Sequence, residues 1–253
     1  MESKLNILLQ KWPYCGIATS EWLDYLGIYK QLRNRYVASH WIESFGHGAF
    51  KRIGDTVAWE GALSAIQYQL KQSIHIGAKT ALEFHGFAHF IPFHETQITL
   101  FSHYPLKLPK WFSQSKLHLK INYYSSSFLK TDVGIDEKNI RGFKLKISSP
   151  ERAIFEVLFL TPHHQSIQES KYLMEGLRTL RPQMVQKLLD HCTSFKVKRL
   201  FLLLAEQEQL PCLEFLNLKN VKLGIGNRTL VKGGVLNKKY KITIPANLFS
   251  HEL

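Results

Sequence analysis

Cysteine is scarce in this sequence, and its spacing argues against the sites that cysteine usually builds. The 253 residues contain only Cys15, Cys192 and Cys212, which lie far apart and form no CxxC pair. An odd and sparse set of thiols supports neither a disulfide framework nor a zinc site, and it is typical of a reducing cytoplasm. We interpret each thiol as a small buried side chain, and we expect neither a metal nor a cofactor.

Long hydrophobic runs are also lacking. Uninterrupted apolar stretches fall well short of the ~20 residues that a membrane helix needs. The first residues, MESKLNILLQKW, show neither the basic region nor the apolar region of a signal peptide. Proline (9) and glycine (15) are few, and 45% of residues are hydrophobic, which is a globular profile. We therefore expect a soluble cytoplasmic protein with no membrane partner.

Acidic residues are outnumbered. The sequence has 33 Lys and Arg against 20 Asp and Glu, a net charge of +13. A charge so far from zero bears on partners more than on fold. Nucleic acid is the commonest partner of such a protein, whereas an anionic membrane or an acidic protein fits less often. The alternative is a solvated basic surface with no binding role.

The first forty residues predict three short helices. Apolar residues at helical spacing, N-cap residues at Thr19 and Ser20, and a helix-ending Gly27 define them. Their ranges are Leu5–Trp12, Glu21–Leu26 and about Tyr29–Ser39. Three short helices with a glycine turn before the third are typical of a helix-turn-helix.

A hairpin is predicted directly after the third helix. Two runs rich in β-favouring residues, Trp41–Phe45 and Ala49–Ile53, flank the turn sequence Gly46-His47-Gly48. A hairpin in this place is the wing of a winged helix. Helices follow at Trp59–Leu70 and Thr80–Phe84, and we place a domain boundary near Pro92, which gives domains 1–92 and 93–253.

The third predicted helix carries side chains suited to DNA. At 3.6 residues per turn, Lys30 lies beside Asn34 and Gln31 lies beside Arg35, so the four form two neighbouring rows. Arginine pairs with guanine edges, and Asn or Gln pairs with adenine. The predicted DNA-binding residues of helix and hairpin are Lys30, Gln31, Arg33, Asn34, Arg35, His47, Lys51 and Arg52. A solvated helix face with no DNA is the alternative interpretation.

The second half of the chain predicts a mixture of strands and helices. Strands are expected at Gln97–Phe101, Leu117–Tyr124, Gly142–Ile147 and Tyr240–Ile244. A helix should begin at Pro150 behind Ser149 as N-cap, and others are expected at Lys171–Leu180, Pro182–Cys192 and Lys196–Glu208. The fold class is therefore α+β, with an N-terminal winged helix-turn-helix before a larger mixed domain.

A second basic stretch runs from Leu216 to Lys241 and contains no acidic residue. Its basic residues are Lys219, Lys222, Arg228, Lys232, Lys238, Lys239 and Lys241. They could extend a nucleic-acid track, bind a phosphate-bearing ligand or meet an acidic partner. A solvated lysine face is an equally good interpretation.

Enzyme signatures are poor. The sequence shows no HExxH, GxSxG or paired catalytic carboxylates. His163 and His164 are adjacent and so point to different faces of a regular element, and His85, His89 and His94 have no matching acid or cysteine. We predict a protein that is not an enzyme.

Five segments, in order, resemble the AbiEi antitoxins of type IV toxin–antitoxin systems, which are abortive infection systems. They span about Trp41 to Pro245 and read WIESFGHGAFKRIGDTVAWEGALSAIQYQL, IHIGAKTALEFHGFAHFI, SPERAIFEVL, LMEGLRTLRPQMVQKLLDHCTSFKVKRLFLLLAE and LVKGGVLNKKYKITIP. One departure is Ala78 in HIGAKTALE, where members of the family more often have a second glycine.

The resemblance implies a winged helix that binds inverted repeats of double-stranded DNA in its own promoter and represses the operon. It places the recognition-helix and wing positions at Lys30, Arg33, Asn34, Arg35, Lys51 and Arg52. It also implies a C-terminal domain that neutralises a cognate nucleotidyltransferase toxin without forming a stable complex with it.

Two other hypotheses stay open. The chain could be an enzyme that modifies the toxin or an RNA through its basic C-terminal surface. It could also be an adaptor that uses the same surface to hold the toxin or another acidic protein. A nucleotide-dependent change in the toxin's mass would favour the first, and co-purification with a stable partner would favour the second.

Overall fold

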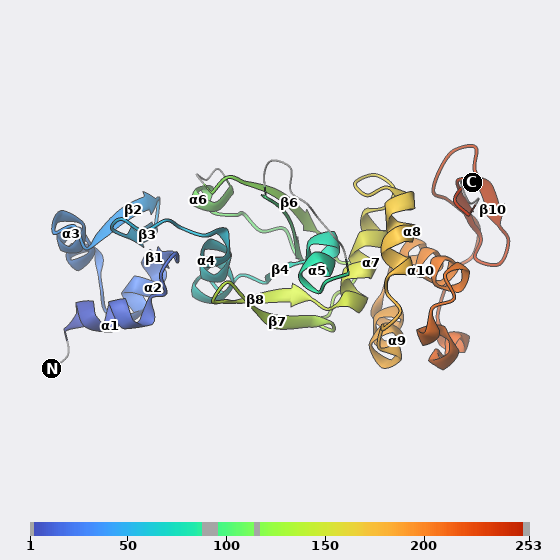
Figure 1. Cartoon of the computed structure of the whole chain (residues 1–253), viewed down its shortest axis with the longest axis horizontal. Helices are drawn as coiled ribbons and strands as arrows, with labels where there is room; N and C mark the ends of the chain where they lie inside the picture. Colours follow the sequence, from blue (N-terminus) through green and yellow to red (C-terminus); the bar gives the residue numbers. More distant parts are fainter. Residues whose placement is uncertain (1–2, 88–95, 114–116, 250–253) are drawn as a thin grey trace. The chain divides into compact units, whose positions relative to one another are not determined.

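The computed structural model describes residues 3–87, 96–113 and 117–249 (Figure 1). The chain forms two compact units, each assembled from separated parts of the sequence. Unit 1 comprises Met1–His75, Pro92–Ser125 and Glu137–Lys146, and unit 2 comprises Ile76–Ile91, Ser126–Asp136 and Ile147–Leu253. Pro92, His89 and His94 lie outside the described residues, and the division into 1–92 and 93–253 stays a prediction.

Unit 1 begins with a winged helix-turn-helix (Figure 1). Its elements are α1 (Lys4–Lys11), β1 (Ala18–Thr19), α2 (Ser20–Tyr25), α3 (Lys30–Ala38), β2 (Ile42–Gly46) and β3 (Ala49–Arg52). The three strands form an antiparallel sheet in the order β1-β3-β2. The three helices and the hairpin predicted from the sequence are confirmed, each within two residues.

Capping residues set the starts of the first two helices, and the helices pack around a small hydrophobic core. The hydroxyl of Ser3 accepts a hydrogen bond from the Asn6 amide, and that of Thr19 accepts one from the Trp22 amide, each at 3.2 Å. Such caps satisfy amides that have no partner inside the helix. The buried core consists of Leu8, Trp12, Ala18, Leu23, Ile28 and Ile42.

The rest of unit 1 continues with α4 (Trp59–Ser64), extended by a π-helical turn at Ala65–Gln69. It then includes β5 (Thr96–Ser102), α6 (Lys110–Ser113) and β6 (Leu119–Ser125). Gly61 lets α4 approach the loop between α1 and β1, because a Cβ there would lie 2.4 Å from the Cys15 carbonyl oxygen. The side chain of Gln67 donates to the Ile74 carbonyl and accepts from the Lys146 amide.

Five strands form the main sheet in the order β6-β5-β4-β8-β7, where β4 is Ile74–Ile76, β7 is Ile135–Ile140 and β8 is Phe143–Ser148. Strands β5 and β6 pair in parallel along their whole length. Strands β7 and β8 are joined by Arg141 and Gly142, both with positive φ (49° and 84°), as a two-residue hairpin turn requires. Neither β4 nor β7 is among the strands predicted from the sequence. β7 was missed because its sequence, IDEKNI, is mostly charged.

Unit 2 is centred on α7 (Pro150–Leu160), which begins behind Ser149 as predicted. The helix contacts α5 (Ala78–Phe84), α8 (Ile167–Glu175), α9 (Pro182–His191) and α10 (Phe195–Gln207). The prediction of a helix at Lys171–Leu180 was wrong in its bounds. The Ser166 hydroxyl caps the helix by accepting a hydrogen bond from the Glu169 amide, so the helix begins at Ile167, earlier than predicted. It ends at Glu175, with Gly176 as the C-cap residue.

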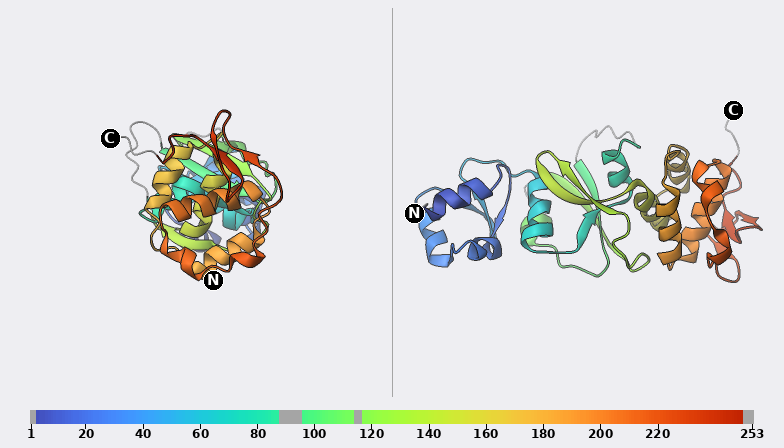
Figure 2. Two further views of the ribbon diagram at one scale, coloured as in Figure 1. Left: turned by 90° about the vertical axis from the view of Figure 1, so that its right-hand side faces the viewer. Right: turned by 90° about the horizontal axis from the view of Figure 1, so that it is seen from below.

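The C-terminal part of unit 2 contains two short 3₁₀ helices, Pro211–Phe215 and Leu218–Asn220, and a small sheet drawn in red in Figure 2. The sheet consists of β9 (Arg228–Thr229), β10 (Val235–Asn237) and β11 (Ile242–Ile244) in the order β10-β11-β9. The buried guanidinium of Arg199 holds the segment before the sheet. It donates to the carbonyl oxygens of Leu223, Gly224, Gly226 and Lys241 at 2.7–3.0 Å.

The fold class is α+β, as predicted. Across the described part of the chain, no helix is both long and apolar enough to span a bilayer.

Candidate nucleic-acid interface

One side of α3 presents unpaired polar side chains to solvent. Lys30, Gln31, Asn34 and Arg35 are all exposed. Among the described residues, none of these four side chains has a hydrogen-bond or ion-pair partner. Helical spacing sets Lys30 beside Asn34 and Gln31 beside Arg35. We call these four residues the α3 face. Its donors and acceptors are free to bond phosphate oxygens and base edges.

Arg33 does not belong to the α3 face, although the sequence analysis counted it among the DNA-binding residues. The residue is only 9% exposed, and its guanidinium forms an ion pair with Asp24 of α2. The same group donates to the carbonyl oxygen of Ile28 at 3.0 Å and to that of Ser20 at 3.3 Å. Arg33 therefore joins α3 to α2 and to the turn between them, and its donors are not available to DNA.

The tip of the hairpin is anchored at both sides of the turn. Gly48, with φ +74°, accepts a hydrogen bond from the Ser20 amide at 2.9 Å. Gly46 lies so close to Trp111 of α6 that a Cβ at this position would be 2.7 Å from the Trp111 Cβ. His47 alone of the three turn residues is exposed. The hairpin thus offers one titratable side chain at a fixed tip.

The two basic residues of β3 are also occupied inside unit 1. The Lys51 ammonium lies 2.9 Å from a Glu43 carboxylate oxygen and donates to the Asp55 carbonyl at 2.7 Å. The Arg52 guanidinium donates to the carbonyl oxygens of Leu9 and Trp12 at the end of α1, and lies 4.3 Å from the centroid of the Tyr14 ring. Cations at a helix C-terminus are favoured by its dipole. Arg52 therefore fastens the hairpin to α1, and the expectation that both side chains point to DNA must be corrected.

One exposed residue beside the α3 face was missed. Tyr29 is the N-cap residue of α3, yet its side chain makes no capping hydrogen bond and it is 61% exposed. A tyrosine hydroxyl next to Lys30 is a suitable donor to a phosphate oxygen. An aromatic residue at the cap position of the helix is the sequence signal that could have found it.

The second basic stretch is spread over the C-terminal part of unit 2 rather than gathered on one element. All seven of its basic residues are exposed. Lys239 forms an ion pair with Glu206 of α10, so it is partly neutralised. Lys222 lines a pocket, together with residues of α9 and α10.

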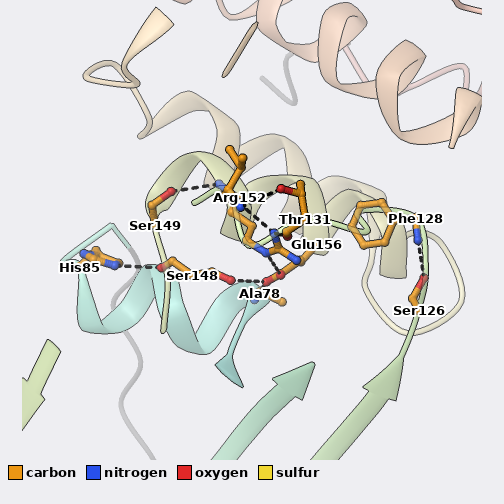
Figure 3. Close-up of polar contacts among 10 residues, drawn as sticks. Ala78, His85, Ser126, Phe128, Thr131, Ser148, Ser149, Arg152 and Glu156 are labelled. Carbon is orange, nitrogen blue, oxygen red and sulfur yellow. Dashed lines mark hydrogen bonds and ion pairs between the residues drawn. The ribbon is translucent and has the colours of Figure 1, made fainter. Parts of the chain in front are cut away.

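A buried polar cluster lies at the start of α7 (Figure 3). Arg152 and Glu156 form an ion pair of 2.9 Å, and both are almost fully buried. Glu156 also accepts from the Ala78 amide and the Ser148 hydroxyl, at 2.9 and 2.8 Å. Arg152 donates to the carbonyl oxygens of Thr131 and Val133. These bonds tie α5, β8 and the 131–133 loop to α7, so the cluster has a structural role.

Of the histidines singled out in the sequence, the structure describes His85, His163 and His164, and these three are not gathered into a site. His163 and His164 are exposed, and the His85 ring nitrogen lies 3.0 Å from the Ser148 carbonyl oxygen. Within residues 3–87, 96–113 and 117–249, no group of three or more His, Cys, Asp or Glu is arranged to hold a metal ion.

Comparisons with known proteins agree with this architecture. Residues 1–93 match the family described as the N-terminal domain of the AbiEi antitoxin, a transcriptional regulator, and residues 95–245 match the family described as transcriptional regulator, AbiEi antitoxin, type IV TA system. No curated protein matches the chain. The crystal structure of the RV2827C protein from Mycobacterium tuberculosis is similar in fold, with a TM-score of 0.59 at 12% identity over 94% of this chain and 88% of that one. The chain belongs to the AbiEi antitoxin family of transcriptional regulators of type IV toxin–antitoxin systems.

Proposed function

We propose that this regulator represses its own operon by binding inverted repeats in promoter DNA through the α3 face. The observation that carries the proposal is the set of four exposed side chains without partners, at two neighbouring rows of a helix that the winged helix-turn-helix presents to solvent. Polar side chains that have no partner inside the protein are free to form hydrogen bonds with a ligand. The resemblance to AbiEi antitoxins supports the choice of inverted repeats in the protein's own promoter as the DNA that is bound.

The contacts divide by chemistry and position. Lys30 and Tyr29, at the beginning of α3, bind phosphate oxygens, where the helix N-terminus also favours an anion. Gln31, Asn34 and Arg35 reach base edges in the major groove, as the N-terminal residues of recognition helices do. His47, exposed at the hairpin tip, contacts the neighbouring backbone. Arg33, Lys51 and Arg52 position the surface from inside.

A mobility-shift titration of the full chain against its own upstream DNA tests this proposal. We expect Arg35→Ala to lower affinity for the operator by about tenfold or more, and Lys11→Ala to leave it within about twofold, since exposed Lys11 lies on α1. Specific binding should also weaken steeply with salt, with a log-log slope of about −0.9 for each phosphate neutralised. Equal losses in both variants, or binding that ignores sequence, would contradict the proposal.

We further propose that residues 93–253 neutralise a cognate nucleotidyltransferase toxin, without a stable complex and without chemistry on the toxin. Residues 95–245 match the antitoxin family model, which supports this part. Co-expression with the toxin is the test. Arg35→Ala should still protect cells, the toxin should keep its mass, and the two proteins should elute separately on gel filtration. A modified toxin would instead support an enzyme, and co-elution would support an adaptor.

A further inference from the structure

Unit 2 contains a pocket of about 380 Å³ between the end of α9, the start of α10 and the segment after Leu218–Asn220. The residues that line it are Leu189, Asp190, Cys192, Thr193, Phe195, Lys198, Asn220, Val221 and Lys222. We call it the Lys198 pocket. Its polar groups come from two stretches of sequence about thirty residues apart, so the fold assembles it.

Lys198 is the feature that demands an explanation. The residue is only 4% exposed, and among the described residues its ammonium has no hydrogen-bond or ion-pair partner. The ammonium lies 5.4 Å from the centroid of the Phe195 ring, which also lines the pocket. The ammonium is not among the buried side-chain atoms that lack a partner, so it reaches the open side of the pocket. Lysines as recessed as this one are as a rule paired. A lysine that is recessed in a pocket and makes no hydrogen bond or ion pair has the properties of a binding group.

The surroundings of Lys198 favour an anionic ligand. Lys222 adds a second ammonium at the same pocket, and α10 begins there, so its N-terminal dipole adds positive potential. Burial lowers the pKa of Lys198, the nearby carboxylate of Asp190 raises it, and Lys222 lowers it further.

Two groups that could compete with an anion are restrained. Burial raises the pKa of Cys192 to about 11, and its thiol donates to the Ser194 carbonyl, so it stays neutral. Asp190, the one carboxylate of the lining, is exposed and accepts a hydrogen bond from Gln186 at 3.0 Å. It forms no ion pair with Lys198 within 4.0 Å in the described structure.

We propose that the Lys198 pocket binds a phosphomonoester, such as the terminal phosphate of a mononucleotide. The phosphate oxygens accept from the ammonium groups of Lys198 and Lys222, and the exposed Asn220 side-chain amide supplies a neutral donor. A terminal phosphate fits better than a phosphodiester within a nucleic acid, because Lys198 is recessed and a continuous backbone would have to enter the pocket. The volume lies at the lower end of the ~300–1,000 Å³ usual for small-molecule sites.

Isothermal titration of the full chain with adenosine monophosphate and with inorganic phosphate tests the proposal, with adenosine as the ligand that lacks the phosphate. We expect both phosphates to bind and adenosine to show no heat. Lys198→Met keeps most of the side-chain volume and removes the charge, so it should weaken binding by about tenfold to a hundredfold. Lys222→Glu, at an exposed position, should weaken it by about tenfold. Lys219→Ala, exposed and outside the pocket, is the matched control and should change affinity by less than about twofold.

Several results would overturn the proposal: no binding of either phosphate, equal binding of adenosine, or unchanged affinity in Lys222→Glu. An oligonucleotide without terminal phosphates that bound as well as adenosine monophosphate, and lost binding in Lys222→Glu, would assign the site to a nucleic-acid backbone instead. Circular dichroism checks the fold of Lys198→Met, and Lys222→Glu decides the question if that variant does not fold. Operator binding should be unaffected in both variants. The phosphate-binding proposal and the proposal for the α3 face can therefore be contradicted separately.

Discussion

The guanidinium of Arg33 forms an ion pair with the carboxylate of Asp24, and this contact joins the third helix of the winged helix-turn-helix to the second. The pair divides the basic residues of α3 into two kinds. Arg33 faces inward and stabilises the domain, whereas Arg35, two residues along, is exposed and has no partner in the described structure. Two arginines of one helix therefore make a matched test of folding against DNA recognition.

Arg33→Ala should destabilise the protein by about 2 kcal/mol, because it removes a buried donor from Asp24 and from two carbonyl oxygens. The estimate is moderate because the Asp24 side chain is 44% exposed and partly hydrated. Urea unfolding followed by circular dichroism measures the loss. Arg35→Ala should unfold within about 0.5 kcal/mol of the natural chain. Equal stability of the two variants would show that the Arg33 contacts do not hold the domain.

The pair of Glu151 and Arg181 predicts an acid-sensitive contribution to stability. Burial disfavours the charged carboxylate, but hydrogen bonds from the Arg181 side chain and amide outweigh it and lower the pKa of Glu151 to about 2. The unfolded value is about 4.3, so the contribution is complete above that pH and is lost as the pH falls towards 2. We expect a loss of roughly 2 kcal/mol, discounted because the Arg181 side chain is 55% exposed.

Unfolding of Glu151→Gln and of the natural chain between pH 2.5 and 7 measures this contribution. The variant should be less stable at pH 7, and the difference should shrink as the pH falls. Parallel curves across this range would show that Glu151 does not titrate as described.

Arg199 should stabilise the C-terminal sheet and the segment before it against local unfolding. Lysine cannot replace its four hydrogen bonds to carbonyl oxygens, because an ammonium has three donors and lacks the planar fork. We expect Arg199→Lys to destabilise the protein by about 3 kcal/mol and to accelerate amide exchange in residues 223–244 more than in α7. Arg228→Lys, at an exposed position, is the control. Unchanged exchange in 223–244 would contradict this role.

Ala78 has a φ of +49°, in the region that favours glycine. This is the position at which the resemblance to AbiEi antitoxins predicts a glycine. In Ala78→Gly, relief of backbone strain of about 1–2 kcal/mol offsets the loss of a buried methyl and the added flexibility of the unfolded chain. We expect nearly unchanged stability. Ala81→Gly, buried in the same helix α5 and without this strain, should cost about 2 kcal/mol. Thermal unfolding of both variants tests the comparison, and equal losses would argue against strain at Ala78.

The sequence by itself determined the helices and the hairpin of the winged helix-turn-helix, the start of α7 and the family. These features depend on local chemistry: caps at Thr19 and Ser149, glycine at the turns, and apolar residues at helical spacing. β7 could not be predicted in this way, because a charged strand such as IDEKNI is recognised only through its pairing with β8.

Only the tertiary structure decided which charged residues face inward. Helical periodicity tells which residues share a side, but neighbouring elements decide which sides are covered. Arg33 finds its partners in the preceding helix and turn, whereas Arg52 and Arg199 find theirs in elements distant in the sequence. The donors of all three serve folding. Lys198 meets no such partner in the described structure and shares a pocket with Lys222, 24 residues further along. Net charge is a property of composition, whereas a binding site depends on which charges the fold leaves unpaired.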